Sequence, residues 1–391
     1  MKKILALMLA AVMLLCMSAC GDAAAPEKTT QPAAQDDTAT QADMDKLESL
    51  YTGREAYHGE LHDHADTGGT SDGKNTLRQW KENMLYVKDM DFAAIVDHRQ
   101  VLHMRLEEWD YTIFIGGTEA GTHILDTKAT QDSVHYNMIF AEPEGLENVL
   151  NAYPAQFQYL NDHFTYPKWT EAEMAQLIAI VNENGGFFVH VHPLGDKYML
   201  SDDPLDYVFA DYTGFEVLCG YYGNMSAKDN QEAYDYWKQI LAAGRKVYAT
   251  SGSDSHRLSN TVSLSTIYSQ AKDAKAYLEH IRAGDFTAGP AGIRMCMGDT
   301  KMGGETGFAG QRLVVSVGDF HSIEYDPTHT YRIDVYNEKG LVMSQEITGQ
   351  DKTYVAMDAD PACMFYRAEV YDVTADYIFA LGNPIWNTQV S

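Results

Sequence analysis

The sequence has few basic residues relative to acidic ones. Its 29 Lys and Arg residues are outnumbered by 56 Asp and Glu residues, which gives a formal net charge of −27 at pH 7. A surface this acidic repels nucleic-acid phosphates, so we expect no nucleic-acid polymer as a partner. It does not exclude a small anionic substrate, because metals and a few Arg or Lys side chains reverse the potential inside one cleft.

Cysteine is also scarce. The five cysteines, at positions 16, 20, 219, 296 and 363, show no CxxC spacing. Their number and spacing do not indicate a disulfide scaffold. We therefore expect Cys219, Cys296 and Cys363 to be small, buried hydrophobic residues.

The amino-terminal apolar run, Ile4 to Leu15, is too short to span a membrane comfortably. It follows Lys2-Lys3 and leads through small residues to Cys20, a pattern typical of a targeting segment over residues 1–20. Met17-Ser18-Ala19-Cys20 resembles a bacterial lipobox, with Met where Leu is usual. We expect lipidation of Cys20 to tether the protein to the outer face of the cytoplasmic membrane. Secretion after ordinary signal cleavage is the alternative.

The remainder of the chain divides into three regions. Residues 21–49 contain no aromatic residue and are rich in Ala, Thr, Gln, Asp and Pro, which predicts a disordered linker. From 50 to 290, strand-like runs alternate with helix-like ones, which favours a parallel α/β architecture. Residues 291–391 contain short β-rich stretches between turn signals, so we predict a small antiparallel, sandwich-like β domain there.

Particular segments of the α/β region carry these signals. The expected strands are 93–96, 112–115, 187–189 and 246–249, and the expected helices are 77–87, 171–183 and 230–243. Polar motif residues stand at or just after the carboxyl ends of the strands. In barrels of parallel strands that end carries the active site, so the pattern predicts the site's location as well as the fold.

Five short motifs of histidine and carboxylate residues lie in this region. They are His62-Asp63-His64 with Asp72, Asp97-His98, Glu119, His190-Val191-His192-Pro193 and Asp254-Ser255-His256, with His135 between the third and the fourth. Imidazole and carboxylate groups are ligands of zinc, manganese and iron. Residues two apart on a strand share a face, so the first histidine pair can ligate one ion. The ordered set predicts a metal-dependent hydrolase that holds two or three divalent ions (Zn, Mn or Fe).

Four residues beside the ligands are expected to act in catalysis. Asp97 either ligates a metal or orients a ligating imidazole, and we favour the second role. His190 shares a strand face with His192 under strict alternation, which predicts a supporting or substrate-contacting role. Arg99 and Arg257 each follow a motif histidine and suit phosphate, because guanidinium donates two parallel hydrogen bonds.

Ordinary surface charge is the alternative interpretation of both arginines. Lys197, five residues beyond His192, is a weaker candidate for contact with substrate.

The order of the motifs, with Ser71-Asp72-Gly73 after the first, resembles the PHP (polymerase and histidinol phosphatase) superfamily. Gly289-Pro290 and Asn383-Pro384-Ile385-Trp386 resemble its carbaryl-hydrolase-like branch. The resemblance covers roughly residues 55–390. It implies a distorted seven-stranded α/β barrel of PHP type, followed by the small antiparallel β domain.

The same resemblance implies three metal positions. The implied ligand sets are His62, His64, Glu119 and Asp254 for the first, Glu119, His135 and His192 for the second, and Asp72, His98 and His256 for the third. Glu119 would bridge the first two positions.

We therefore expect an extracytoplasmic phosphoesterase acting on a small phosphoester such as a nucleotide, sugar phosphate or inositol phosphate. A metal-bridging hydroxide would be its nucleophile. The first alternative is an ester, carbamate or amide hydrolase that uses the same site. The second is a lipid-tethered binding module, which would have no need for an intact set of Glu119, Asp254 and His256.

Overall fold

The computed structural model describes residues 38–125, 133–157, 167–195, 200–220, 227–260 and 263–390. The expected targeting segment, its lipidation site Cys20, the linker up to residue 37 and Lys197 lie outside these residues. In the part that is described, no helix is both long enough and apolar enough to cross a membrane.

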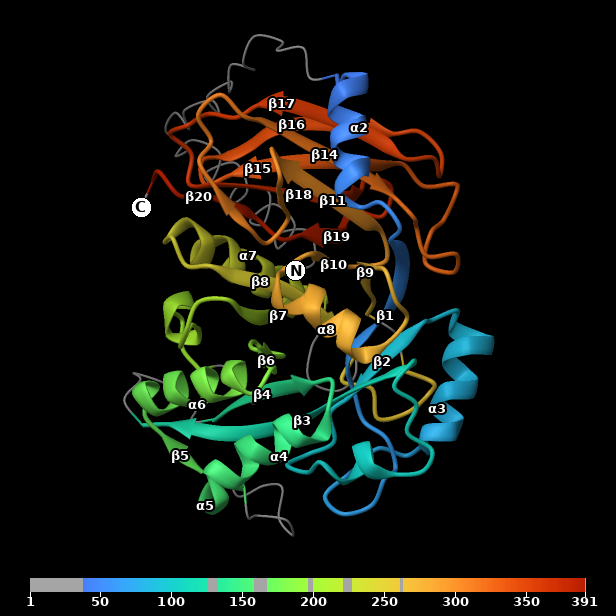
Figure 1. Cartoon of the computed structure of the whole chain (residues 1–391), viewed down its shortest axis with the longest axis vertical. Coiled ribbons are helices and arrows are strands. Elements are labelled where there is room, and N and C mark those ends of the chain that lie inside the picture. Colours follow the sequence, from blue (N-terminus) through green and yellow to red (C-terminus); the bar gives the residue numbers. More distant parts are fainter. Residues whose placement is uncertain are drawn as a thin grey trace, which may run out of the picture. The chain divides into compact units, whose positions relative to one another are not determined.

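A long curled sheet carries the histidine-rich motifs (Figure 1). Its central strands, in spatial order, are β9 (Ser265–Ser269), β1 (Glu55–Asp63), β2 (Phe92–Ile95), β3 (Phe114–Ile124), β4 (Ser133–Phe140), β6 (Phe187–Val191), β7 (Thr213–Cys219) and β8 (Val247–Gly252). An isolated parallel bridge joins Asp63 to Ser255, which brings the chain after β8 beside the end of β1. The first motif, at the end of β1, and the last motif, after β8, therefore lie side by side.

The strands of this sheet are not all parallel, as the alternating pattern had suggested. β1, β2 and β3 run parallel, and so do β6, β7 and β8. β4 runs antiparallel to both of its neighbours, and β9 runs antiparallel to β1. Only about eight residues separate β3 from β4, too few for the crossover that parallel neighbours need, so the pair is antiparallel.

The expected elements of this region are confirmed; the helix over 171–183 has the predicted bounds, and the ends of the others are shifted. The helices and short elements around the sheet are α3 (Leu77–Asn83), which continues as a π-helical turn η1 (Met84–Lys88), η2 (Leu102–Arg105), α4 (Pro143–Ala152), α5 (Pro154–Phe157), β5 (Lys168–Trp169), α6 (Glu171–Glu183), η3 (Pro204–Tyr207), α7 (Ala227–Ala242) and α8 (Ala274–Arg282). Thr76 and Thr170 begin α3 and α6 with reciprocal capping boxes. β3 is much longer than predicted, so Glu119 lies inside a strand rather than after one.

A second, four-stranded antiparallel sheet lies in the carboxyl-terminal part. The strands of this part are β10 (Phe286–Ala288), β11 (Gly292–Met297), β12 (Thr300–Lys301), β13 (Glu305–Thr306), β14 (Arg312–Gly318), β15 (Tyr331–Asn337), β16 (Gly340–Ile347), β17 (Thr353–Asp358), β18 (Phe365–Asp372), β19 (Tyr377–Gly382) and β20 (Ile385–Asn387). The second sheet has the order β12-β11-β14-β17. β15, β16, β18 and β19 instead extend the long sheet, because β19 pairs with β10.

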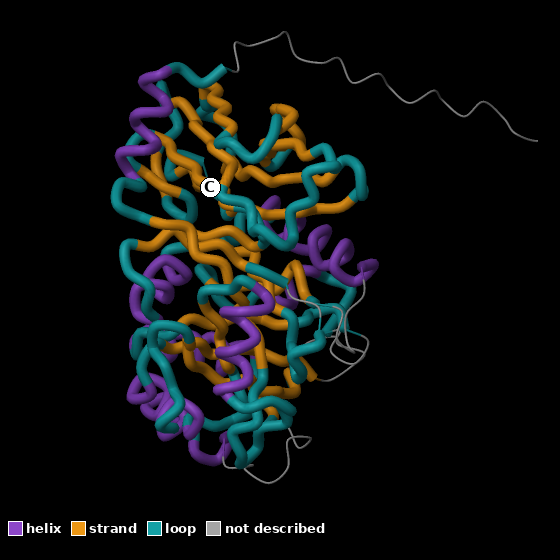
Figure 2. Tube along the Cα trace, turned by 90° about the vertical axis from the view of Figure 1, so that its right-hand side faces the viewer, coloured by secondary structure: helices purple, strands orange, loops and turns teal. Residues whose placement is uncertain are grey.

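The two sheets of this part enclose one apolar core, to which Ile293, Val315, Ile333 and Val370 contribute. The fold is thus a mixed α/β structure with a curled sheet and a smaller antiparallel sheet. Figure 2 shows strands predominating at the end of the molecule that holds the smaller sheet, while most of the helices surround the other end.

The prediction of a disordered linker up to residue 49 is wrong for residues 41–49, which belong to helix α2 (Gln41–Leu50). Thr40 and Asp43 form its capping box. Its one fully buried side chain, Leu47, packs in a small core with Tyr268 and Cys296. Figure 1 shows α2 against the smaller sheet, running across its strands. Contacts made far along the chain supply the burial that the composition of this segment lacks.

Candidate metal centre

The nine expected ligands converge in three overlapping groups. They are the first group, His62, His64, Glu119 and Asp254, the second group, Glu119, His135 and His192, and the third group, His64, Asp72, His98 and His256. Within each group the ligand atoms lie within 4.8 Å of one another. The sets agree with those implied by the family resemblance, except that His64 also belongs to the third group.

Glu119 connects the first group to the second. Its Oε2 lies 3.0 Å from His64 Nε2 and 3.4 Å from His62 Nε2. Its Oε1 lies 3.2 Å from His192 Nε2 and makes a close contact with His135 Nδ1. The residue is 1% exposed, and its backbone N–H donates to the Val96 carbonyl at the end of β2. One carboxylate thus presents one oxygen to each group.

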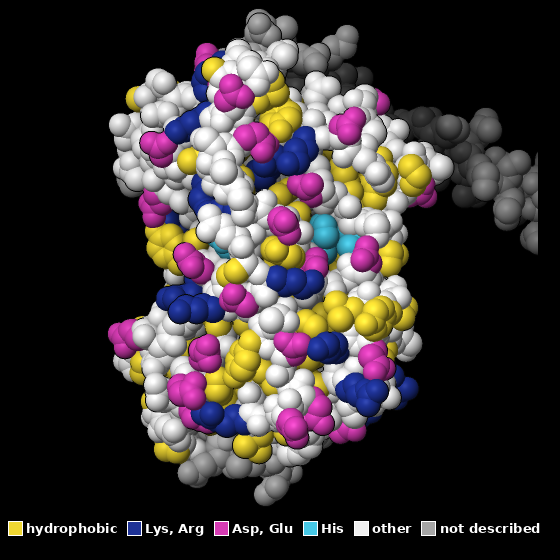
Figure 3. Space-filling view, turned by 45° about the vertical axis from the view of Figure 1, so that its right-hand side comes forward, with side chains coloured by type: hydrophobic (Ala, Val, Ile, Leu, Met, Phe, Trp, Pro, Cys, Tyr) yellow, Lys and Arg dark blue, Asp and Glu magenta, His cyan; other side chains and the backbone are white. Residues whose placement is uncertain are grey.

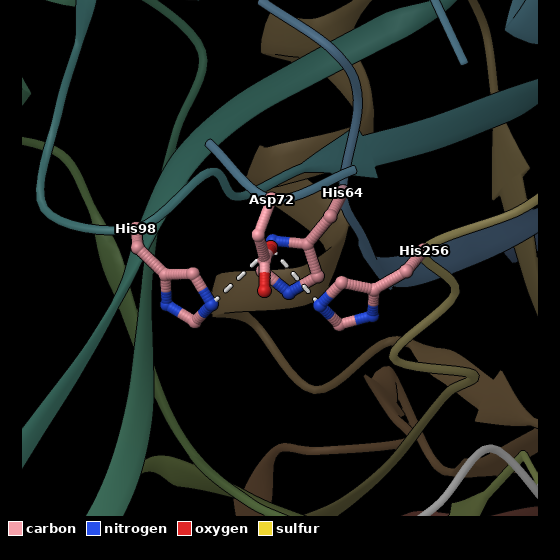
Figure 4. A group of neighbouring side chains, drawn as sticks. All are labelled: His64, Asp72, His98 and His256. Carbon is pink, nitrogen blue, oxygen red and sulfur yellow. Dashed lines mark ion pairs between the residues drawn. The ribbon is translucent and has the colours of Figure 1, made fainter. Parts of the chain in front are cut away.

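The third group is shown in Figure 4. Asp72 Oδ1 lies 3.0 Å from His256 Nε2 and 3.6 Å from His98 Nε2. The His64 ring stacks against both imidazoles, with centroid distances of 4.7 Å to His98 and 4.4 Å to His256. Four ligand atoms from separate segments of the chain therefore face one point.

The loop after β1 folds back to place Asp72 in this group. The backbone N–H of Lys74 donates to the His256 carbonyl over 2.9 Å. A Cβ on Gly73 would lie 2.5 Å from the backbone of Ala65, so only glycine permits this close approach. The long stretch between His64 and Asp72 closes on itself and keeps the carboxylate beside the histidines.

Asp254 and His98 hold the form that binds metals, whereas, despite burial, the neighbouring Asp254 and Glu119 carboxylates raise the pKa of His64 to about 10. Burial alone would raise the pKa of Asp254, but His62 and His64 lower it to about 2, so the carboxylate is ionised. Burial lowers the pKa of His98 to about 3 against the opposing effect of Glu119, so this imidazole is neutral. Ionised carboxylates and neutral imidazoles are the forms that bind metals.

The charge balance also fits divalent cations. Among the described residues, the ion-pair partners of Glu119, Asp254 and Asp72 are all histidines. Without a metal ion, these carboxylates are balanced by protons on imidazoles such as His64, and a divalent cation would replace those protons. The donor set of imidazole nitrogen and carboxylate oxygen suits zinc, manganese or iron.

His190 lies apart from the three groups, and the expectation that it shares a face with His192 is wrong. In the β4–β6 ladder His190 pairs with Tyr136, whereas Val191 pairs with the ligand His135. Alternation therefore turns His190 away from the ligands, and its ring stacks on Phe209 with an interplanar angle of 8°. A left-handed φ of 30° at His192 breaks the alternation after β6 ends, so only the second histidine reaches the centre.

Asp97 lies beside the groups without belonging to any of them. Its Oδ1 accepts a hydrogen bond of 2.9 Å from the Ala65 N–H, and its Oδ2 accepts one from the Thr67 hydroxyl. The distance from Oδ1 to His64 Nδ1 is 3.9 Å, too long for a hydrogen bond. The carboxylate therefore secures the turn that follows β1, close to a ligand.

The two arginines occupy different environments. Arg99 is 2% exposed, and its backbone N–H donates to the Glu119 carbonyl over 3.0 Å. Arg257 is exposed and lines an open cavity of about 500 Å³ with Lys74 and Asn75. None of the residues that line this cavity is a member of the three groups, although Arg257 follows His256 directly along the chain.

One residue at the centre escaped the sequence analysis. The Glu216 carboxylate accepts hydrogen bonds from His62 Nδ1 (3.1 Å) and from the backbone N–H of His192 (2.7 Å). The available signal was a single carboxylate inside the otherwise apolar, buried strand β7. Buried carboxylates without a partner are rare, so such a residue in a core strand indicates a polar contact.

Comparisons with known proteins gave limited matches. No protein-family model matches the chain, and no curated protein does. One similar solved structure is a two-domain protein from Bacteroides vulgatus ATCC 8482 that contains a predicted PHP-like metal-dependent phosphoesterase. The two sequences are 12% identical, the match covers 86% of this chain and 95% of that chain, and the TM-score is 0.38. Another is an engineered protein, with 13% identity, 90% and 98% coverage and a TM-score of 0.19. Neither likeness is close enough to identify the fold or the function.

Proposed function

We propose that this protein is a metal-dependent hydrolase of the PHP superfamily, with a distorted seven-stranded barrel, that cleaves a small phosphoester. The observation that carries the proposal is the convergence of nine imidazole and carboxylate side chains into three groups that share Glu119 and His64. Adjacent groups joined by a carboxylate suit a multinuclear site, the type used for in-line displacement at phosphorus.

The three groups would hold two or three divalent ions, which supply Lewis acidity and lower the pKa of a coordinated water toward neutrality. Glu119 fixes the spacing of the first two groups, since its Oε2 faces histidines of the first group and its Oε1 faces those of the second. The backbone N–H of Arg99 holds the Glu119 carbonyl, which restrains the strand from which that carboxylate projects. These contacts place the ligands before any substrate arrives.

Two cationic residues within two positions of third-group members along the chain support phosphate over a neutral ester. Lys74 and Arg257 are exposed and line the same cavity. An ammonium and a guanidinium there would contact the non-bridging or leaving oxygens of a phosphoester. On the face drawn in Figure 3, by contrast, the described basic and acidic side chains are interspersed, as on an ordinary soluble surface.

The substrate class we propose is a nucleotide, sugar phosphate or inositol phosphate, whose negative charge suits a site of divalent cations. We place the reaction outside the cytoplasm, on a chain tethered to the membrane through Cys20. The support for this location is the sequence of residues 1–20, with its Lys2-Lys3 pair, apolar run and lipobox-like end.

The test uses the chain without residues 1–20, analysed for bound metals and assayed on bis-p-nitrophenyl phosphate, p-nitrophenyl phosphate and p-nitrophenyl acetate. We expect bound divalent ions and phosphate hydrolysis, both lost in His64→Ala and Asp254→Ala. His329→Ala, in the carboxyl-terminal part and outside all three groups, is the matched control and should keep both. Acetate cleavage without phosphate cleavage would favour the ester or carbamate hydrolase, and bound metal with no turnover of any ester would favour a binding module.

A further inference from the structure

Glu216 lies in the middle of β7 and is 1% exposed. Each of its carboxylate oxygens has a separate partner in the metal centre. Oε1 accepts from His62 Nδ1 over 3.1 Å, and Oε2 accepts from the His192 backbone N–H over 2.7 Å. The first partner belongs to the first group and the second to the second group.

The contact with His62 determines which nitrogen of that ring faces the ligand site. An ionised carboxylate only accepts hydrogen bonds, so Nδ1 must carry the proton. Nε2 is then the nitrogen left to bind a metal ion, and it faces Glu119 Oε2 and Asp254 Oδ1 at 3.4 Å and 3.5 Å. A carboxylate behind a ligating imidazole commonly fixes the tautomer and orientation of the ring in this way.

The contact with His192 acts on the backbone. His192 has a left-handed φ of 30°, a conformation that is unfavourable for a non-glycine residue. The hydrogen bond that the buried His192 N–H donates to Glu216 Oε2 satisfies this N–H and holds the residue in that conformation. In this conformation His192 Nε2 lies 3.2 Å from Glu119 Oε1.

The neighbouring strand leaves space for this arrangement. A Cβ on Gly252 in β8 would lie 2.8 Å from Glu216 Oε1 and 2.4 Å from the His62 Cβ. Only glycine at this position lets the carboxylate approach the imidazole. Residues of three strands, β1, β7 and β8, therefore determine the position of the Glu216 carboxylate.

We propose that Glu216 is a positioning residue of the metal centre, which fixes the His62 tautomer and the His192 backbone and thereby sets the first two groups relative to each other. This inference rests on the proposed function in one respect only, that these groups bind divalent ions. It does not depend on which ester is cleaved.

Glu216→Gln tests the proposal, because glutamine keeps the size of the side chain but has one acceptor oxygen in place of two. We expect metal affinity about 10- to 100-fold weaker, measured with Zn²⁺ by competition against a chelator. In the Zn²⁺-loaded wild type, ¹⁵N-resolved NMR of the imidazoles should show a proton on His62 Nδ1. Glu216→Asp retains two acceptors on a shorter side chain and should give an intermediate affinity.

Thr213→Val is the matched control on the same strand. It removes a hydroxyl that donates to the Ala210 carbonyl and touches no ligand, so wild-type affinity is expected. A folded Glu216→Gln protein with wild-type affinity would overturn the proposal, and so would Zn²⁺-loaded wild type with the His62 proton on Nε2. If Glu216→Gln does not fold, the NMR result on the wild type decides.

The two proposals fail differently. Wild-type protein that binds Zn²⁺ but cleaves no ester would contradict the proposed function and leave the expected effect of Glu216 on affinity in place. Wild-type protein that binds no divalent ion would overturn both.

Discussion

His64 Nε2 lies 3.0 Å from Glu119 Oε2, and this pair connects all three ligand groups. His64 is shared by the first and third groups, and Glu119 by the first and second. His64 follows β1 directly, whereas Glu119 lies inside β3, so the centre depends on the register of the strands between them. A change at either residue should therefore affect more than one ion.

Removing a ligand that two groups share should lower the number of bound metal ions more than removing a ligand of one group. Asp72→Ala removes a ligand of the third group alone, so we expect about one divalent ion per chain fewer, with the other two groups still loaded. His64→Ala should reduce occupancy in two groups. Elemental analysis of both variants, purified and reconstituted identically, measures the difference. Equal losses in the two variants would contradict the sharing.

His190 should be dispensable for the chemistry. It lies among Tyr207, Phe209 and Phe215 and faces away from the ligands. His190→Phe keeps a flat ring there and loses only the contact of Nδ1 with the Tyr207 carbonyl. We expect unchanged metal content, and a free energy of unfolding lower by about 1 kcal/mol, measured by urea denaturation. A loss of bound metal would show that the ring acts on the centre after all.

The contribution of α2 can be measured through Glu48. Its carboxylate accepts hydrogen bonds from Arg294, which is 3% exposed, and from the Tyr354 hydroxyl. Glu48→Ala leaves a buried guanidinium without this partner, so we expect destabilisation of about 1–3 kcal/mol in urea unfolding. Metal content should not change.

Asp45→Ala is the matched control for that variant. Asp45 lies on the exposed side of the same helix and only accepts from Gln41. Its removal should change the unfolding free energy by less than about 0.5 kcal/mol. Equal effects of the two substitutions would mean that α2 contributes through helix propensity rather than through Arg294.

The stability of the metal-free protein should depend on pH through His58. Burial and the neighbouring His321 lower the pKa of His58 to about 4, below the ordinary value of 6.5. Between these values the unfolded chain binds more protons, so stability should rise as pH increases from 4 to 6.5. His58→Asn, which preserves an acceptor or donor near the Thr266 hydroxyl, should flatten this slope in urea unfolding at several pH values. An unchanged slope would assign the effect to other groups.

The grouping of the nine candidate ligands was predictable because they belong to short sequence motifs. Each lies near the end of a buried strand, and ligand chemistry limits which side chains can serve. Glu119 is instructive, since its strand was assigned too short and yet its role as the shared ligand agrees with the geometry.

The features that sequence reasoning missed depend on long-range contacts. Helix α2 has little apolar surface of its own and is held by Arg294, 246 residues away from Glu48. Glu216 is a lone carboxylate whose partners come from β1 and from the residue after β6. The backbone turn at His192, which separates it from His190, has no local signal such as glycine. Tertiary packing, not local propensity, determines all three.

The most direct test of the central claim is the number of divalent ions bound per chain in the wild type and in Glu119→Gln, measured by elemental analysis after identical reconstitution. We predict two or three ions in the wild type and a substantial loss in the variant, because one carboxylate serves two groups. A wild-type chain that binds no divalent ion, or a variant that retains the full number, would contradict the account.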